Sequence, residues 1–384
     1  MSTSTVIAAF YFTFLGALGC FWPYFGMHLS SVGLSASEAT QVMSVWPLVG
    51  LLAPPILGLV ADARLARNAI LRVVTGLAAV SFCGFFFAKT LPALYATTAL
   101  VALTRSSVLP MADAAALDAV RSDGGSYGRM RALGSLGFLV MAVLAGQLIG
   151  HWDTRAGIGL TVALVLMTLV VALRLPAAPV AAQRRSTAFA EWLHLVGRKD
   201  LWVFLAAVAF AQLGNAIYDA GFSLHLKKLD HGPGFISAAW SLGVGGEVAL
   251  MLVSARLLAT VGPAWLFAGT VMVACARWLL LAQVTEPWLL LVLAPLHGVS
   301  FGLFYVAGVT VMRDKGAATP TAAQGLFAAA IAVGAVVGMN ISGSILDRAG
   351  GRAMFSVAAC AAAIGALIAA SHARWLAEPE PAVV

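Results

Sequence analysis

The chain has 384 residues, of which 61% are apolar and 10% are charged, whereas roughly 25% of the residues of a soluble protein are charged. So few charges cannot cover a soluble globule of this length. The same figures exclude a disordered chain, a collagen-like chain and a disulfide scaffold. A mean hydropathy of +0.93 therefore favours a polytopic membrane protein.

Apolar runs long enough to cross a bilayer recur along the chain, since a spanning helix needs about 20 mostly apolar residues. We predict twelve spans, at 6–29, 40–61, 69–88, 92–117, 132–150, 156–174, 201–224, 236–259, 264–283, 287–311, 322–343 and 353–373. The first run has no Lys or Arg ahead of it, so we expect a retained helix rather than a signal peptide. The connections are short and leave no room for a soluble domain.

The loop charges predict the orientation of these spans. Loops on the side of the N-terminus hold 15 Lys and Arg residues, and loops on the other side hold 6. By the positive-inside rule, both termini are cytoplasmic. This bias accounts for the net charge of +7 without a nucleic-acid partner.

The longest polar stretch, 176–200, divides the chain into predicted halves of six spans each, 1–175 and 201–384. A faint repeat supports this division: LAGQLIGHWDTRAGI ends the fifth span and ISGSILDRAGGRAMF the eleventh, which places Gly146 and Gly343 197 positions apart. Two related six-helix halves are the organisation of major facilitator transporters.

Several ionisable residues interrupt the apolar runs, at a cost of at least ~2.5–3.5 kcal/mol each. They are Arg105, Asp113, Asp219, Glu247, Arg277 and His297, with Arg131 at the start of the fifth span. For each residue taken alone, a structural role and a functional role agree equally well with the sequence. As a set spread over both halves, they predict a water-filled central cavity.

Glu247 is the sharpest candidate, because it follows three glycines in WSLGVGGEVALML. Low-dielectric surroundings disfavour a charged carboxylate, which suits Glu247 to reversible protonation. Arg277 is suited either to holding an acid deprotonated or to binding an anionic substrate. His297 suits a proton relay, or else it is a structural residue satisfied by hydrogen bonds.

Other motifs complete the sequence-based prediction. The connection GLVADARLAR carries a predicted gating loop formed by Gly58, Asp62, Arg64 and Arg67. No GxxxxGK[ST], HExxH or GxSxG motif occurs, so we expect neither an ATPase nor an enzyme, and no cofactor. The four cysteines show no CxxC spacing, which argues against a metal site or a disulfide framework.

Matching segments follow one another along the whole chain: YFTFLGALGCFWPYF, GLSASE, PMADAAALDAV, SYGRMRALGSLGF, WSLGVGGEVALMLVSARLL, ARW and LHGVSFGLFYVAGV. With these segments the chain resembles the oligosaccharide and phenylpropionate permease branch of the major facilitator superfamily. It looks closest to the phenylpropionic acid transporter group, a bacterial set of proton symporters. The resemblance implies an all-α membrane protein with twelve transmembrane helices in two pseudo-symmetric bundles.

A more distant likeness to the lactose permease group implies roles for single residues. Asp113 and Arg131 have the spacing of its sugar-binding pair, and Glu247 looks like its coupling acid. Arg277 and His297 resemble an arginine and a histidine of its ninth and tenth helices. Asp219 lacks the lysine partners expected there.

These patterns and resemblances lead to one main hypothesis. Asp113, Arg131 and Arg105 bind the solute, while Glu247, His297 and Asp219 couple it to protons. Further substrate-binding candidates are Arg277, which is also suited to holding an acid charged, and the aromatic residues Trp240, Trp278 and Tyr305, unless these rings pack against lipid.

The expected function is secondary transport of a small organic solute, with an aromatic carboxylate favoured by the resemblance, by proton symport with alternating access. We expect a monomer in the bilayer of the bacterial inner membrane. Two alternatives stay open: proton-coupled efflux of drugs or metabolites, and a non-transporting sensor or assembly protein on the same fold.

Overall fold

A computed structural model describes residues 2–61, 67–106, 108–123, 126–175, 196–315 and 320–377, and all regular structure in these ranges is helical, as predicted. The elements follow in the order α1 (Thr3–Ser31), α2 (Ala36–Ala61), α3 (Arg67–Cys83), η1 (Gly84–Phe86), α4 (Leu91–Ser106), α5 (Val108–Asp123), α6 (Tyr127–His151), α7 (Thr154–Leu173), α9 (Lys199–Lys228), α10 (Pro233–Val261), α11 (Pro263–Leu281), α12 (Pro287–Leu293), η2 (Ala294–Leu296), η3 (Gly298–Leu303), α13 (Phe304–Lys315) and α14 (Pro320–Ala377).

Within the described ranges, nine helical stretches are long and apolar enough to cross a membrane. The last of them, Ala323–His372, contains both of the final predicted spans. A turn divides it at Gly350, whose φ of 77° and ψ of 178° belong to a region that essentially only glycine adopts. The membrane fold is confirmed, and the count of twelve spans stays a prediction.

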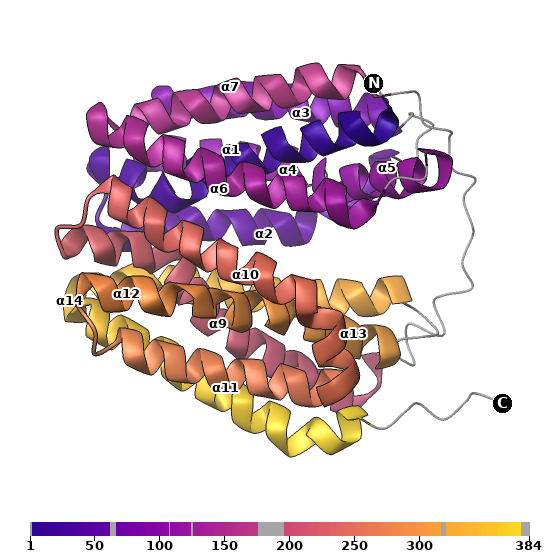
Figure 1. Ribbon diagram of the computed structural model, residues 1–384. Helices are drawn as coiled ribbons and strands as arrows, with labels where there is room; N and C mark the ends of the chain where they lie inside the picture. The colour runs from indigo at the N-terminus through magenta and orange to yellow at the C-terminus, as the bar shows by residue number, and fades with distance from the viewer. Residues whose placement is uncertain are drawn as a thin grey trace. The chain divides into compact units, whose positions relative to one another are not determined.

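The chain divides into two compact units. Unit 1 comprises Met1–Gln183 and Leu226–Ser241, and unit 2 comprises Arg184–His225 and Leu242–Val384. In unit 1, α1 packs against α6 and α7, and α3 packs against α4 and α7 (Figure 1). In unit 2, α11 packs against α13 and α14. The predicted halves, 1–175 and 201–384, stay a prediction.

One close helix contact is repeated in the two units. A Cβ atom on Gly137 of α6 would lie 2.2 Å from the carbonyl oxygen of Phe12 on α1. In unit 2, a Cβ atom on Gly334 of α14 would lie 2.3 Å from the carbonyl oxygen of Ala209 on α9. Both residues of the second pair follow those of the first by the 197 positions that separate Gly146 and Gly343. Small residues at such crossings let helix backbones approach closely.

The helix starts carry local signals that the sequence supplies. Ser35 and Glu38 form a capping box before α2, in which each backbone N–H donates to the other side chain, at 2.9 and 3.2 Å. The Asp153 carboxylate accepts a hydrogen bond from the Arg155 N–H at 2.7 Å at the start of α7. Pro263 and Pro287 open α11 and α12, where a missing N–H costs nothing.

The tenth predicted span is irregular. Its helix α12 passes through the 3₁₀ turn η2 and then through the π-helical segment η3 before α13 begins. Wider π turns of this kind occur mostly as short bulges at functional sites. The predicted span over 287–311 corresponds to the helical stretch Pro287–Lys315, and the π turns within it are a feature that the sequence pattern does not distinguish from α turns.

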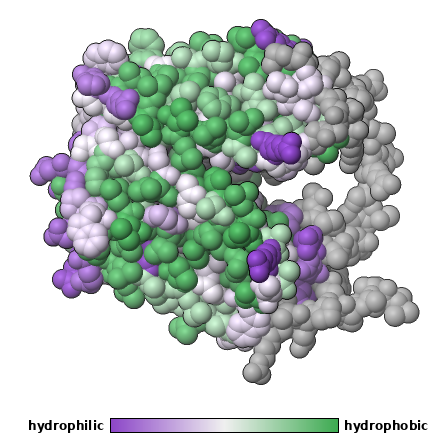
Figure 2. Space-filling model, viewed as in Figure 1, coloured by the Kyte–Doolittle hydropathy of each residue, from purple (hydrophilic) through white to green (hydrophobic). Residues whose placement is uncertain are grey.

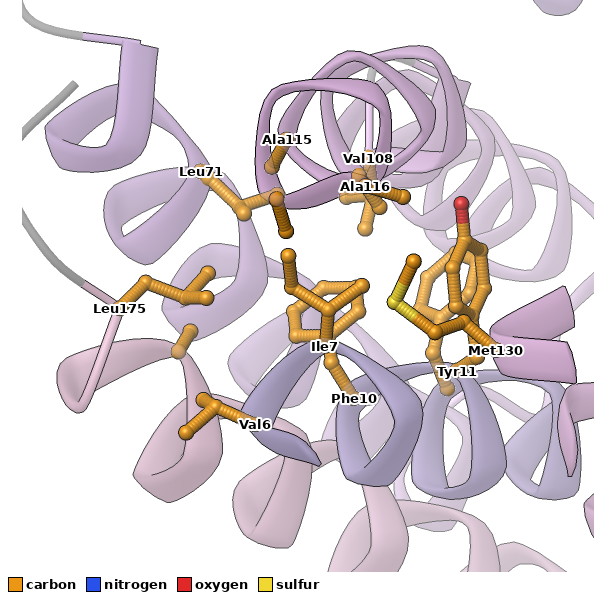
Figure 3. Packing of buried hydrophobic residues seen from close by; sticks show 14 of the residues in the cluster. Val6, Ile7, Phe10, Tyr11, Leu71, Val108, Ala115, Ala116, Met130 and Leu175 are labelled. Atoms are coloured by element: carbon orange, nitrogen blue, oxygen red, sulfur yellow. The ribbon is translucent and has the colours of Figure 1, made fainter. Parts of the chain in front are cut away.

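The surface of the molecule has the character expected in lipid. Large apolar side chains on several helices are strongly exposed, among them Val80, Phe87, Leu252 and Leu367 at 71 to 82%. Figure 2 shows broad apolar areas on the visible face. A buried hydrophobic cluster in unit 1 combines residues of α1, α3, α5, α6 and the end of α7, and Figure 3 shows Tyr11 in it with its hydroxyl group at the edge.

Candidate functional site

A polar cluster in unit 1 surrounds Asp113 on α5. The hydroxyl groups of Tyr11 and Tyr127 both donate to Asp113 Oδ1, the latter at 3.2 Å. The Arg131 guanidinium carbon lies 5.8 Å from the centre of the Tyr11 ring. Tyr11 thus links the acid and the arginine that the sequence singled out, and the four residues form what we call the Asp113 cluster.

Arg105 on α4 has a different environment. It is 7% exposed, and its guanidinium carbon lies 4.3 Å from the ring centre of Phe14, 5.7 Å from that of Trp46 and 5.9 Å from that of Phe82. Phe14 follows Tyr11 by one turn of α1, so Arg105 and the Asp113 cluster occupy neighbouring levels of that helix.

Unit 2 contains a second buried arginine, Arg277 on α11, which is 1% exposed. Its guanidinium carbon lies 4.3 Å from the centre of the Tyr218 ring and 4.5 Å from that of Trp278. Its Nη1 atom donates to the Ser300 hydroxyl oxygen at 2.9 Å. Cation–π contacts and this hydrogen bond stabilise the guanidinium, whose Nε and Nη2 atoms are buried without a hydrogen-bond partner among the described residues.

Asp219 connects Arg277 with a second acid, Glu247. Asp219 on α9 lies within electrostatic range of both Arg277 and Glu247. Asp219 lacks the lysines of the lactose permease group, and α11 places Arg277 near it instead. One arginine and two carboxylates form what we call the Arg277 triad.

Glu247 on α10 lies against the π-helical segment η3. A Cβ atom on Gly302 would lie 2.7 Å from Glu247 Cγ, and one on Gly298 would lie 2.6 Å from the Glu247 backbone nitrogen. Only glycine at position 302 leaves room for the Glu247 side chain, so Glu247 packs directly against the η3 backbone. The side chain of Asn215 on α9 donates to the Ser300 carbonyl oxygen at 2.9 Å and holds the same segment.

His297 directly precedes η3 and is 5% exposed. Its ring lies 5.7 Å from that of Tyr218 and stacks on that of Phe301 at 5.4 Å. Tyr218 therefore contacts both Arg277 and His297. The structure thus groups Arg277, His297, Asp219 and Glu247 around one aromatic ring and one irregular helix segment.

Comparison with known proteins identifies the family. The MFS_1 like family, a branch of the major facilitator superfamily, matches residues 4–357. The chain belongs to this family. The resemblance predicted from the sequence is thereby confirmed, and the protein is a membrane transporter of the major facilitator type.

Two named relatives are similar over most of their length. The maltose permease of Geobacillus stearothermophilus is 29% identical over 310 residues, which cover 78% of this chain and 76% of that protein. The probable 3-phenylpropionic acid transporter of Escherichia coli (strain K12) is 25% identical over 366 residues, which cover 93% and 94%.

Solved structures share the fold at lower sequence identity. The nucleoside transporter NupG superposes with a TM-score of 0.84 at 17% identity, covering 99% of this chain and all of that one. A peptide transporter of the POT family superposes with a TM-score of 0.77 at 10% identity, covering 97% and 96%. At these identities the likeness concerns the fold alone.

In the structure of this family member, two of the predicted aromatic residues are buried and one is exposed. Trp278 is fully buried between Tyr218 and Phe355, at 5.1 and 6.4 Å between ring centres. Trp240 is buried as well, at 5% exposed, whereas Tyr305 is 45% exposed. Of the three rings, Tyr305 has the most surface to offer a solute in this conformation.

The predicted gating loop lies outside the described residues. Asp62 and Arg64 fall between α2 and α3 in a part of the chain that the structure does not describe, and the same holds for the side chains of Gly58 and Arg67. Among the described residues, no three His, Cys, Asp or Glu side chains group as a metal site would require.

Sequence reasoning missed the uncharged members of the site. Tyr127 precedes Arg131 by four residues, and Asn215 precedes Asp219 by four, so helical spacing alone places each pair on one face. Tyr11 and Ser300 carry no such signal, since their partners Asp113 and Arg277 lie on other helices.

Proposed function

We propose that this transporter carries a small organic solute across the bacterial inner membrane in symport with protons, by alternating access. It is a carrier and not an enzyme. Its partners are the solute, protons and the lipid bilayer, and it acts as a monomer without a cofactor. The halves 1–175 and 201–384 rock about the linker 176–200 with both termini in the cytoplasm.

The observation that carries the coupling proposal is the composition of the Arg277 triad. Asp219 lies within electrostatic range of Arg277, which is buried in unit 2, and of a second carboxylate, that of Glu247. In low dielectric one carboxylate is stabilised as an anion by the arginine, and the second is favoured in its neutral form. Glu247 takes up and releases this proton, and His297 relays it past Tyr218.

The solute side of the proposal rests on unit 1. The Asp113 cluster offers a carboxylate, a guanidinium and two phenol groups. Together they can bind both hydrogen-bond donors and hydrogen-bond acceptors of a solute. Arg105 supplies positive charge and Trp240 an aromatic ring in this unit, and Trp278 and Tyr305 of unit 2 supply further rings. These groups suit an aromatic carboxylate, and one relative carries 3-phenylpropionic acid in its name. The loop with Gly58, Asp62, Arg64 and Arg67 gates the pathway.

Flux measurements in proteoliposomes under an imposed pH gradient test the proposal. We expect the protein to accumulate labelled aromatic carboxylates only when the gradient drives protons inward. Glu247→Gln should abolish accumulation while solute exchange without a gradient continues. Glu286→Gln makes the same chemical change at an exposed site beside α12 and should behave like the wild type.

The alternatives have different outcomes in the same vesicles. Solute expelled against its gradient as protons enter would establish proton-driven efflux. No flux across a broad panel of solutes would favour a sensor or assembly protein. Gradient-driven accumulation that survives Glu247→Gln would contradict the coupling role of the Arg277 triad.

A further inference from the structure

Arg105 is a buried cation whose charge the described residues do not balance. It lies about 20 Å along α4 from Leu91, at 1.5 Å per residue, which is too deep for lipid headgroups to reach from that end. A charged side chain at such depth is costly unless it pairs with another group. Its Nη1 atom is buried without a hydrogen-bond acceptor, and no described carboxylate lies within ion-pair distance.

Arg72 in the same unit shows how a structural arginine is satisfied here. Its Nε donates to the carbonyl oxygen of Ala172 at 3.2 Å, and its Nη2 donates to that of Leu175 at 2.7 Å. Arg105 has no comparable acceptor among the described residues. Asp113, the acid of unit 1 nearest in sequence, instead accepts from Tyr11 and Tyr127.

The walls around Arg105 are aromatic. Phe14, Trp46 and Phe82 come from three different helices, and their ring faces stabilise a cation but accept no strong hydrogen bond. Trp46 continues this surface, since its ring lies 5.9 Å from Phe21 and 5.6 Å from Trp22. Both tryptophans are partly exposed, so the aromatic surface beside the cation is open at one end.

We propose that Arg105 is the anion-binding residue of a subsite in unit 1 that takes the carboxylate of an aromatic organic acid. The guanidinium donates to both carboxylate oxygens, and the solute ring packs against Trp46 and Phe14. The inference rests on the proposed transport function, since the solute reaches the subsite by the transport pathway. It assigns the solute carboxylate to Arg105 rather than to Arg277, which has the Asp219 carboxylate within electrostatic range and donates to Ser300.

Equilibrium binding to the purified full-length protein tests this assignment without any gradient. The probes are benzoate, phenylacetate and 3-phenylpropionate, each compared with its uncharged amide of the same shape, and inorganic phosphate as a bare anion. We expect the carboxylates to bind about 10- to 100-fold more tightly than the amides, as a charge-assisted hydrogen bond implies.

The variants separate charge from shape. Arg105→Gln should remove the preference for carboxylate over amide and leave amide binding within about threefold, a difference of less than 1 kcal/mol. Arg105→Lys keeps the charge and should retain part of the preference, which also guards against a folding defect. Arg256→Gln removes an exposed arginine from α10 and should bind all probes as the wild type does.

Three outcomes would overturn the assignment. They are a carboxylate preference that survives Arg105→Gln, wild-type protein that binds none of the three acids, and phosphate binding as tight as acid binding with the same dependence on Arg105. The two proposals fail separately. Arg105-dependent binding without proton-driven uptake refutes coupling alone, whereas coupled uptake without a carboxylate preference refutes the subsite alone.

Discussion

The two units each bury one arginine among aromatic rings, but they balance its charge differently. Arg277 in unit 2 has the Asp219 carboxylate within electrostatic range and donates to Ser300, while its Nε and Nη2 atoms have no hydrogen-bond partner in the part of the chain that the structure describes. Arg105 in unit 1 has three rings around it and no hydrogen bond to a described residue. A cation with a carboxylate in electrostatic range suits coupling to protons, and a cation without one among the described residues suits binding an anionic solute.

The largest expected effect distinguishes the two arginines directly. Arg277→Gln removes the cation near Asp219, two cation–π contacts and the donor to Ser300, and should cost about 3 kcal/mol of stability. Arg105→Gln removes an unbalanced buried charge and should leave stability unchanged or raise it. Thermal unfolding of both variants in the same detergent measures the difference, and equal destabilisation would contradict the comparison. The double variant Arg277→Gln with Asp219→Asn should recover part of the loss.

The next largest effect is expected at Gly302, where η3 packs against Glu247. Gly302→Ala places a Cβ atom 2.7 Å from Glu247 Cγ and should cost about 1–3 kcal/mol through overpacking. It should also slow gradient-driven uptake, because the Glu247 side chain has to move as it takes up and releases the proton. Gly245→Ala in α10 is the control, since a Cβ atom there meets open space. Unchanged stability of Gly302→Ala would mean that α10 and η3 are not in close contact.

A smaller effect is expected from the hydroxyl group that positions Arg277. Ser300→Ala removes the acceptor of Arg277 Nη1 and leaves a buried donor unsatisfied, at a cost of about 1–2 kcal/mol. Proton-driven uptake should fall while solute affinity is retained. Ser254→Ala removes a hydroxyl that donates to the Met251 carbonyl of its own helix and should change neither quantity. Loss of solute affinity in Ser300→Ala would place Arg277 in the solute site instead.

The smallest effect is expected in the Asp113 cluster. Tyr11→Phe removes one of two phenol donors to Asp113. It should weaken the free energy of solute binding by about 0.5–1.5 kcal/mol, which is a few-fold in affinity. Tyr127 keeps the carboxylate partly satisfied, so stability should change little. Ligand binding by the variant measures the effect, and Tyr24→Phe, whose hydroxyl donates to the Ala142 carbonyl oxygen at 2.8 Å, is the control outside the cluster.

The helices were largely predictable because a membrane span needs a continuous apolar run, and such runs are visible in the sequence. Predicted ends were short by a few residues, as at 6–29 against Thr3–Ser31, since helices continue into the interface where polar residues are tolerated. The π segment η3 was not predictable, because backbone contact with Gly246 on α10 and the Asn215 hydrogen bond involve residues distant in the chain.

The sequence by itself determined the membrane class, the family and the few buried charges, because each ionisable group is conspicuous in an apolar run. Only the tertiary structure decided how these charges are balanced. Asp219 and Arg277 lie 58 positions apart, and Glu247 lies on yet another helix. Electrostatic balance depends on distances between helices, which hydropathy does not encode. The same is true of Arg105, whose unbalanced charge became visible only once its aromatic neighbours were in place.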